Sequence, residues 1–85
     1  MEHLTRLIEH LAWADHRTLG ALDCLPAVDP KVLGTYAHVL AAEHIWLTRI
    51  QGKAATVPVW PTLSLAECRR LAAENAAGLR AVVAG

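Results

Sequence analysis

The chain has 85 residues, of which 54% are hydrophobic, and its 8 basic and 8 acidic side chains give a formal net charge of zero. This length suits one domain and is too short for two. The lysines and arginines are scattered, whereas nucleic-acid binding requires a clustered positive face. No apolar run approaches the roughly 20 residues that cross a membrane, and no signal-peptide pattern opens the chain. We therefore expect a cytoplasmic protein with no nucleic-acid and no membrane partner.

The first predicted helix runs from about Glu2 to Leu22. Its leucines and isoleucine recur at spacings of three and four residues, as on one face of a helix. Pro26 ends this segment because it cannot continue the backbone hydrogen bonds. The second predicted helix begins at Asp29–Pro30, a favourable N-cap followed by a proline suited to the first turn. It ends at Gly52, a typical C-terminal stop.

The second helix carries apolar residues on two sides. One side is rich in alanine, and the other carries Val32, Tyr36, Val39, Leu40, Trp46, Leu47 and Ile50. A helix that is apolar most of the way round is usually buried on two sides. We therefore predict that this helix is central and that replacing Trp46 with alanine costs roughly 3–5 kcal/mol. The surplus of apolar surface over what one small core buries predicts a homodimer.

Residues 52–63 are predicted to form an extended loop, because residues that precede prolines favour extended backbone. Trp60 in this loop is expected to pin it to the bundle. The third helix begins at residues 64–67, a Ser-x-x-Glu capping box, and continues to the C-terminus. No strand-like alternation appears. We predict an all-α fold, a single domain over residues 1–85 in which three helices form an antiparallel bundle.

Two acidic residues lie where apolar residues are expected. Asp15 falls within the apolar stripe of the first helix, and Glu43 falls within that of the second. Buried carboxylates are costly unless they are paired, hydrogen-bonded or metal-bound. The simpler interpretation is structural, with each carboxylate accepting a hydrogen bond from a Trp, Tyr or His side chain. A metal or catalytic role is the alternative.

Five histidines suggest metal chemistry, since imidazole is the commonest metal ligand. No two of them show the H-x-x-x-H or H-E-x-x-H spacing of a helical metal pair, so spacing alone leaves metal binding open. Cys24 and Cys68 lack metal-type spacing and are expected to be buried, reduced thiols. No phosphate-binding loop or activated nucleophile motif occurs.

Three segments taken together resemble the DinB family. Residues 7–15 (LIEHLAWAD) are similar to its first-helix W-A-N pattern, with Asp15 in place of Asn. Residues 37–47 (AHVLAAEHIWL) are similar to its second-helix pattern of a His, a Glu five residues later and Trp-Leu. Residues 58–61 (PVWP) precede a capped, alanine-rich helix. The order and spacing of these segments cover almost the whole chain.

The resemblance implies a four-helix bundle, commonly dimeric, that holds a divalent metal with three histidines. His38 corresponds to the ligand from the second helix. The other two ligands belong to an H-x-x-x-H pair on a later helix, and this chain stops at Gly85 before it. The resemblance therefore implies three helices of such a bundle without the last one. Zinc and nickel are the ions that suit imidazole best. Some relatives use the site for thiol-dependent transfer or isomerisation with bacillithiol or mycothiol.

Two functions follow as hypotheses. The first is a divalent-metal-binding protein related to thiol-dependent transferases and hydrolases, whose site at His38 is completed by a partner chain or by residues such as His16 and Glu43. The second is a non-catalytic helical dimerisation module. We expect no tightly bound metal in the isolated chain. If metal is retained without His38, then His10, His16 and His44 are the next candidates. The sequence predicts no substrate.

Overall fold

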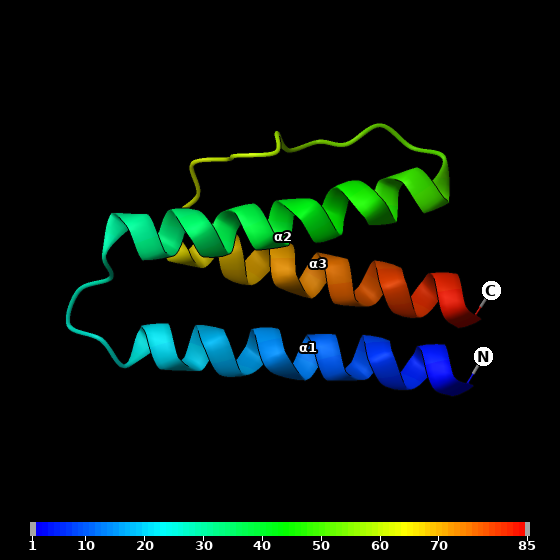
Figure 1. Ribbon diagram of the computed structural model, residues 1–85, viewed down its shortest axis with the longest axis horizontal. Helices are drawn as coiled ribbons and strands as arrows, with labels where there is room; N and C mark the ends of the chain where they lie inside the picture. Colours follow the sequence, from blue (N-terminus) through cyan, green and yellow to red (C-terminus); the bar gives the residue numbers. More distant parts are fainter. Residues whose placement is uncertain (1, 85) are drawn as a thin grey trace.

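A computed structural model of the protein describes residues 2–84; Met1 and Gly85 of the predicted domain lie outside the described residues. It contains α1 (Glu2–Asp23), α2 (Pro30–Gln51) and α3 (Leu65–Ala84), and the described residues form no strand (Figure 1). The all-α prediction is confirmed, and the helix bounds agree closely with those predicted. No helix within residues 2–84 is both long enough and apolar enough to cross a membrane.

Local sequence explains where α2 and α3 begin and where α2 ends. The Asp29 side chain accepts a hydrogen bond of 2.8 Å from the backbone N–H of Lys31. Gly52 ends α2 in the left-handed conformation, with a φ of 70° that glycine adopts without steric cost. The Ser64 hydroxyl accepts from the Glu67 N–H at 3.1 Å, and the Glu67 carboxylate accepts from the Ser64 N–H at 3.0 Å. All three predicted capping signals are confirmed.

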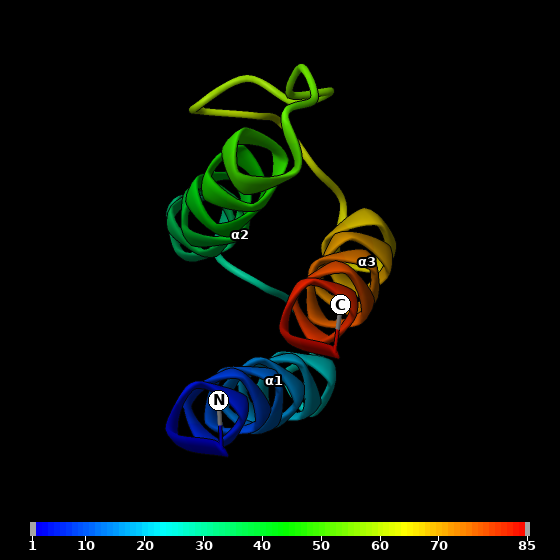
Figure 2. The same cartoon turned by 90° about the vertical axis from the view of Figure 1, so that its right-hand side faces the viewer.

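The central helix is α3, not α2. It packs against both other helices, whereas no Cα atom of α1 lies within 8 Å of one in α2 (Figure 2). Small residues on α3 allow this close approach: a Cβ added at Gly78 would lie 2.5 Å from a terminal methyl of Leu47. The prediction that the second helix is central is therefore wrong. An apolar pattern on α2 does not reveal whether another helix covers each side.

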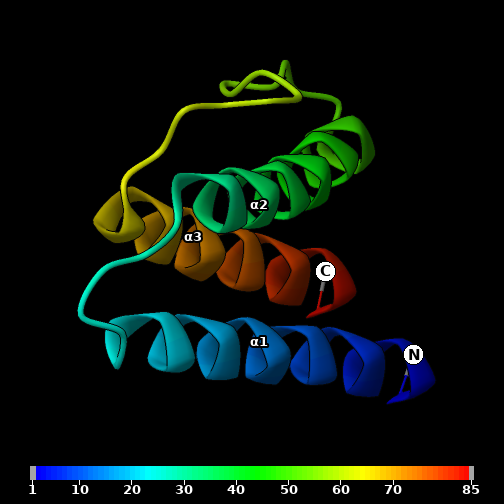
Figure 3. The same ribbon diagram turned by 60° about the vertical axis from the view of Figure 1, so that its left-hand side comes forward.

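Helix α1 runs opposite to α2 and α3, but α2 and α3 run in the same direction (Figures 1 and 3). Contacts along the helices agree. Asn75 donates to the carbonyl of Leu40, and Gly78 lies against Leu47. Residue numbers therefore increase in the same direction along α2 and α3. In contrast, Arg80 pairs with Glu9, near the start of α1. The predicted antiparallel bundle is therefore wrong for α2 and α3.

The loop between α2 and α3 explains the parallel pair. Its 13 residues, 52–64, can span up to about 43 Å when extended, whereas α2 with 22 residues is about 33 Å long. The loop returns along most of α2 before α3 begins (Figure 1). The sequence predicted the extended loop but not its path.

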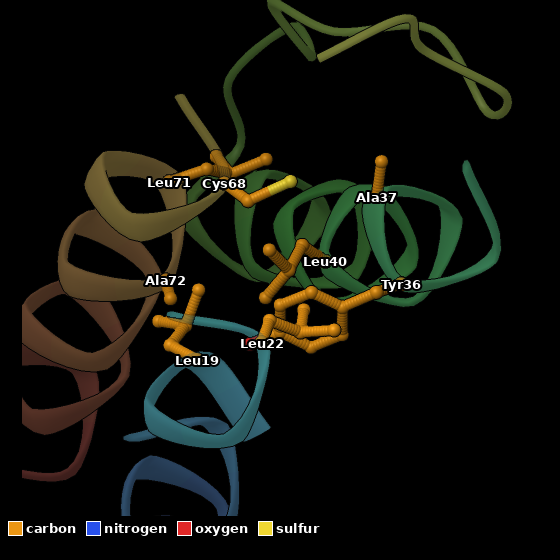
Figure 4. Packing of buried hydrophobic residues seen from close by; sticks show 8 residues of the cluster. All are labelled: Leu19, Leu22, Tyr36, Ala37, Leu40, Cys68, Leu71 and Ala72. Atoms are coloured by element: carbon orange, nitrogen blue, oxygen red, sulfur yellow. The ribbon is translucent and has the colours of Figure 1, made fainter. Parts of the chain in front are cut away.

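The apolar core lies toward the end of the bundle where α1 ends and α3 begins. Leu40 is its centre and is 0% exposed. Figure 4 shows the cluster, which consists of Leu19, Leu22, Tyr36, Ala37, Leu40, Cys68, Leu71 and Ala72. Residues from all three helices meet here, although no Cα atom of α1 lies within 8 Å of one in α2.

Large apolar side chains remain exposed along α1 and α2. They include Leu4, Leu7, Val39, Trp46 and Ile50. Trp46 is 63% exposed, so the expectation that it is buried is wrong. Its truncation to alanine is accordingly expected to cost the isolated chain less than about 1 kcal/mol.

Candidate functional site

An open groove separates α1 from α2, and α3 forms its floor. Its volume is about 520 Å³. It is lined by Leu11, His38, Val39, Ala42, Glu43, Trp46 and Leu79. Leu4 and Leu7 precede Leu11 on the same face of α1, because residues at spacings of three and four share a helix face. We call this surface the α1–α2 groove. Its walls are mostly apolar, and its acidic residue is Glu43.

Asp15 and Glu43 face each other beneath the groove. Asp15 is only 8% exposed. The Tyr36 hydroxyl donates to its carboxylate at 3.3 Å and lies 3.4 Å from its backbone carbonyl. The Asn75 amide donates to Glu43 Oε1 at 3.4 Å and to the Leu40 carbonyl at 3.0 Å. The tyrosine hydroxyl was among the hydrogen-bond donors predicted for these acids, so the structural interpretation of Asp15 is supported.

Burial changes the ionisation of this carboxyl pair. Burial first, and then the neighbouring charge of Asp15, raise the pKa of Glu43 to about 8. Burial also raises the pKa of Asp15. The pKa of Tyr36 is raised by burial and by the Asp15 charge, so its hydroxyl remains a donor. The two carboxyl groups titrate as a pair, and both shifts favour the form in which the pair keeps a proton.

His38 anchors the loop that follows α2. Its Nδ1 lies 2.6 Å from the carbonyl oxygen of Val59, and its ring stacks on Trp60 with centroids 3.7 Å apart. A carbonyl only accepts, so Nδ1 is the donor, and in the neutral ring this leaves the lone pair on Nε2. The expectation that Trp60 pins the loop is confirmed, although the indole packs on a histidine at the surface.

His44, six residues later on α2, anchors the same loop. Its Nε2 lies 3.1 Å from the backbone N–H of Thr56 and 3.2 Å from the Thr56 hydroxyl. An N–H only donates, so Nε2 of His44 is the acceptor and is occupied. Sequence reasoning missed Thr56 as its partner, because nothing in the loop sequence distinguishes this threonine from its neighbours.

The remaining histidines lie elsewhere. His10 stacks on Trp13 with centroids 5.5 Å apart. His16 lines a different groove, between α1 and α3, together with Arg69 and Arg80. The set of His38, His16 and Glu43 is therefore not brought together. Cys68 is buried as predicted, but Cys24 is exposed, since it lies in the turn after α1.

The donor set does not fit a metal ion within one chain. Within residues 2–84, no group of three or more His, Cys, Asp or Glu side chains is arranged to hold a metal. His38 has an available Nε2, but His44, the other histidine of α2, turns its Nε2 to Thr56. The histidines of α2 hold the loop against the helix.

Asn75 is the site residue that sequence reasoning overlooked. It is 1% exposed and connects α3 to Glu43. Its position four residues after Leu71 and four before Leu79, within an apolar stripe, is the signal that could have found it.

None of the family models, curated proteins or solved structures compared with the chain matches it. The likeness to the DinB family therefore rests on the three sequence segments alone.

Proposed function

We propose that this chain is a DinB-like helical domain that acts as a non-catalytic dimerisation module, with a second copy covering the α1–α2 groove. One observation carries the proposal. Val39 and Trp46 line the groove and are exposed. Helical spacing extends the same faces to the exposed side chains of Leu4, Leu7 and Ile50. Contiguous exposed apolar surface of this kind marks an interaction site on a soluble protein.

The dimensions of the groove support a second copy as its occupant. Helices α1 and α2 each have 22 residues, so each presents a face about 33 Å long. A stable dimer buries about 800 Å² on each partner, roughly one seventh of the accessible surface of 5715 Å². A face that extends across both helices is large enough to supply this area. A two-fold axis would place the same face on both partners.

Its residues also connect the groove with the DinB-like segments. His38, Glu43 and Trp46 belong to the segment that resembles the second-helix pattern, and all three line the groove. Asp15, which replaces the Asn of the first-helix pattern, lies beneath it. Residues of the second-helix pattern are therefore gathered at the surface for which we propose a function.

Sedimentation equilibrium tests the proposal. Dimer is expected at micromolar concentration at pH 6 to 7, with the monomer appearing on dilution. A chain that stays monomeric up to about 100 μM would refute it. The free energy of dimerisation would then be weaker than about 5.5 kcal/mol.

Divalent-metal binding is the second candidate, and the geometry of His38 favours it. The bond from Nδ1 to the Val59 carbonyl fixes the ring and its tautomer, as such bonds do for metal-ligating histidines. A zinc or nickel site would need further ligands from another chain, because those within one chain do not converge on His38.

Metal analysis of the purified dimer, prepared without added metal, separates the two candidates. We expect much less than one zinc or nickel ion per chain and a His38→Ala variant that still folds, because one imidazole binds such ions weakly. Near one ion per chain, lost in His38→Ala but kept in a His10→Ala control, would favour the metal candidate. Metal retained without His38 would mean that the ligands lie elsewhere.

A further inference from the structure

Polar side chains reach between the middle of α1 and α2. The two helices make no backbone approach within 8 Å. The Tyr36 hydroxyl reaches across to Asp15, and the Asp15 and Glu43 carboxyl groups are close enough for each to alter the ionisation of the other. The carboxyl groups of Asp15 and Glu43 therefore lie where α1 and α2 come together across the groove.

Within residues 2–84, no ion pair joins a cationic side chain to Asp15 or Glu43. The ion pairs between described residues join Arg6 to Glu2, Arg69 to Asp23, and Arg80 to Glu9. Glu43 Oε2 is buried and has no hydrogen-bond partner within residues 2–84. Two adjacent carboxyl groups, one buried and one half-buried, cannot both ionise without a cation unless strong repulsion is overcome. One proton between them turns the repulsion into an attraction.

We propose that a single proton held between Asp15 and Glu43 keeps α1 closed on α2, and that losing it opens the α1–α2 groove and weakens self-association. The effect on self-association rests on the dimer proposed above. The effect on the groove concerns one chain and stands without it.

The titratable and charged groups around the carboxyl pair come from all three helices. From α2, the Tyr36 hydroxyl faces Asp15, and His38 borders the groove with Glu43. From α3, Asn75 contacts Glu43, and burial raises the pKa of Cys68. On its other side Asp15 borders a groove lined by Glu9, His16, Arg69 and Arg80. The two arginines there are already paired with Asp23 and Glu9.

The direction of the pH effect follows from Glu43. Its pKa in the folded protein is about 8, above the ordinary value of 4.5. Between these values the folded chain keeps a proton that the unfolded chain releases, so stability falls as pH rises. The stabilisation is fully present below about pH 4.5 and is lost as pH passes about 8. The groove is expected to open over the same pH range, because it loses the same proton.

Two readouts from pH 6 to 9.5 test the inference in the full-length protein. The first is the indole N–H resonance of Trp46, which lines the groove and is assigned by comparison with Trp46→Phe. The second is the dimer dissociation constant from sedimentation. In the wild type, the Trp46 resonance is expected to shift with a midpoint near pH 8, and the dissociation constant to rise about tenfold or more, a coupling of typical size.

Matched variants assign the proton. Glu43→Gln keeps a permanent donor in the place of the protonated acid, so its Trp46 resonance and dissociation constant should not change across this range. Glu74→Gln, at an exposed position of α3, should behave as the wild type. Asp15→Asn removes the neighbouring charge and should move the midpoint to lower pH. If Glu43→Gln does not fold, the midpoint in Asp15→Asn decides.

The outcomes separate this inference from the dimer proposal. In one outcome the protein is a monomer at pH 6, while its Trp46 resonance still titrates near pH 8 and is flat in Glu43→Gln. This outcome supports the shared-proton proposal and overturns only the dimer proposal. A dimer whose Trp46 resonance and dissociation constant do not change with pH overturns the shared-proton proposal but not the dimer proposal. Titration that persists unchanged in Glu43→Gln, or an unmoved midpoint in Asp15→Asn, also overturns the inference.

Discussion

Replacing Trp46 with glutamate is expected to raise the dimer dissociation constant at least about 100-fold, the effect of losing one interfacial hot spot worth more than about 2 kcal/mol. Trp46 is a large apolar side chain of the α1–α2 groove and is 63% exposed in the single chain. In the proposed dimer its indole is covered, so the variant places a carboxylate in a desolvated apolar contact. In the monomer the same carboxylate stays in water beside Arg49, whose guanidinium lies 5.2 Å from the Trp46 ring.

The matched control is Trp13→Glu. Trp13 is 57% exposed and lines the groove between α1 and α3 instead. It should leave the dissociation constant within about threefold of the wild type, since substitutions outside an interface have little effect on affinity. Sedimentation equilibrium measures both variants, and circular dichroism checks that both remain helical. Equal weakening by the two substitutions would mean that the α1–α2 groove is not the interface.

Replacing Leu40 with alanine is expected to destabilise the fold by about 3–5 kcal/mol, in the range found for leucines truncated in packed cores. Leu40 is 0% exposed and lies at the centre of the core cluster (Figure 4). Its truncation removes buried methyl groups and leaves a cavity that the three surrounding helices cannot fill. In a chain of 85 residues, such a loss is a large part of the total stability.

Urea unfolding measures this effect, and the Trp46→Glu background keeps dissociation out of the transition. Val39→Ala is the control, because Val39 is the adjacent residue on α2 and is 45% exposed. It should cost less than about 1 kcal/mol in that background. Similar losses in the two variants would contradict the position of the core between the helices.

The helices were predictable because their signals are local. The Asp29 cap, the Gly52 stop and the Ser64–Glu67 capping box each act within a few residues, and each has the expected geometry. The path of the loop after Gly52 is not local. Whether it turns tightly or returns along α2 decides the direction of α3, and an extended sequence permits both.

Burial of α2 was harder to predict than its helicity. Leu40 and Trp46 belong to the same apolar stripe, yet the first is fully buried and the second is exposed. An apolar residue indicates a surface that is favourable to bury. It does not indicate which element covers that surface. For α2, helix α3 covers the Leu40 side, and the Trp46 side is open within one chain.

The candidate site was predictable only in part. Helical periodicity singled out Asp15 and Glu43 as acids in apolar stripes, and both lie between α1 and α2. Asp15 and Glu43 meet because α1 and α2 are antiparallel and their central turns lie side by side. The contribution of Asn75 depends on the parallel direction of α3. His38 was selected by the family resemblance, and its contacts with Val59 and Trp60 arise from the returning loop.

Intermolecular nuclear Overhauser effects between isotope-labelled and unlabelled chains, mixed in one sample, test the central claim most directly. The account predicts that contacts between chains involve the Trp46 indole and the methyl groups of Leu7, Leu11 and Ile50, and that they disappear in Trp46→Glu. Contacts confined to the outer surface of α3 or to the loop at residues 52–64, with none at Trp46, would contradict the assignment of the α1–α2 groove as the dimer interface.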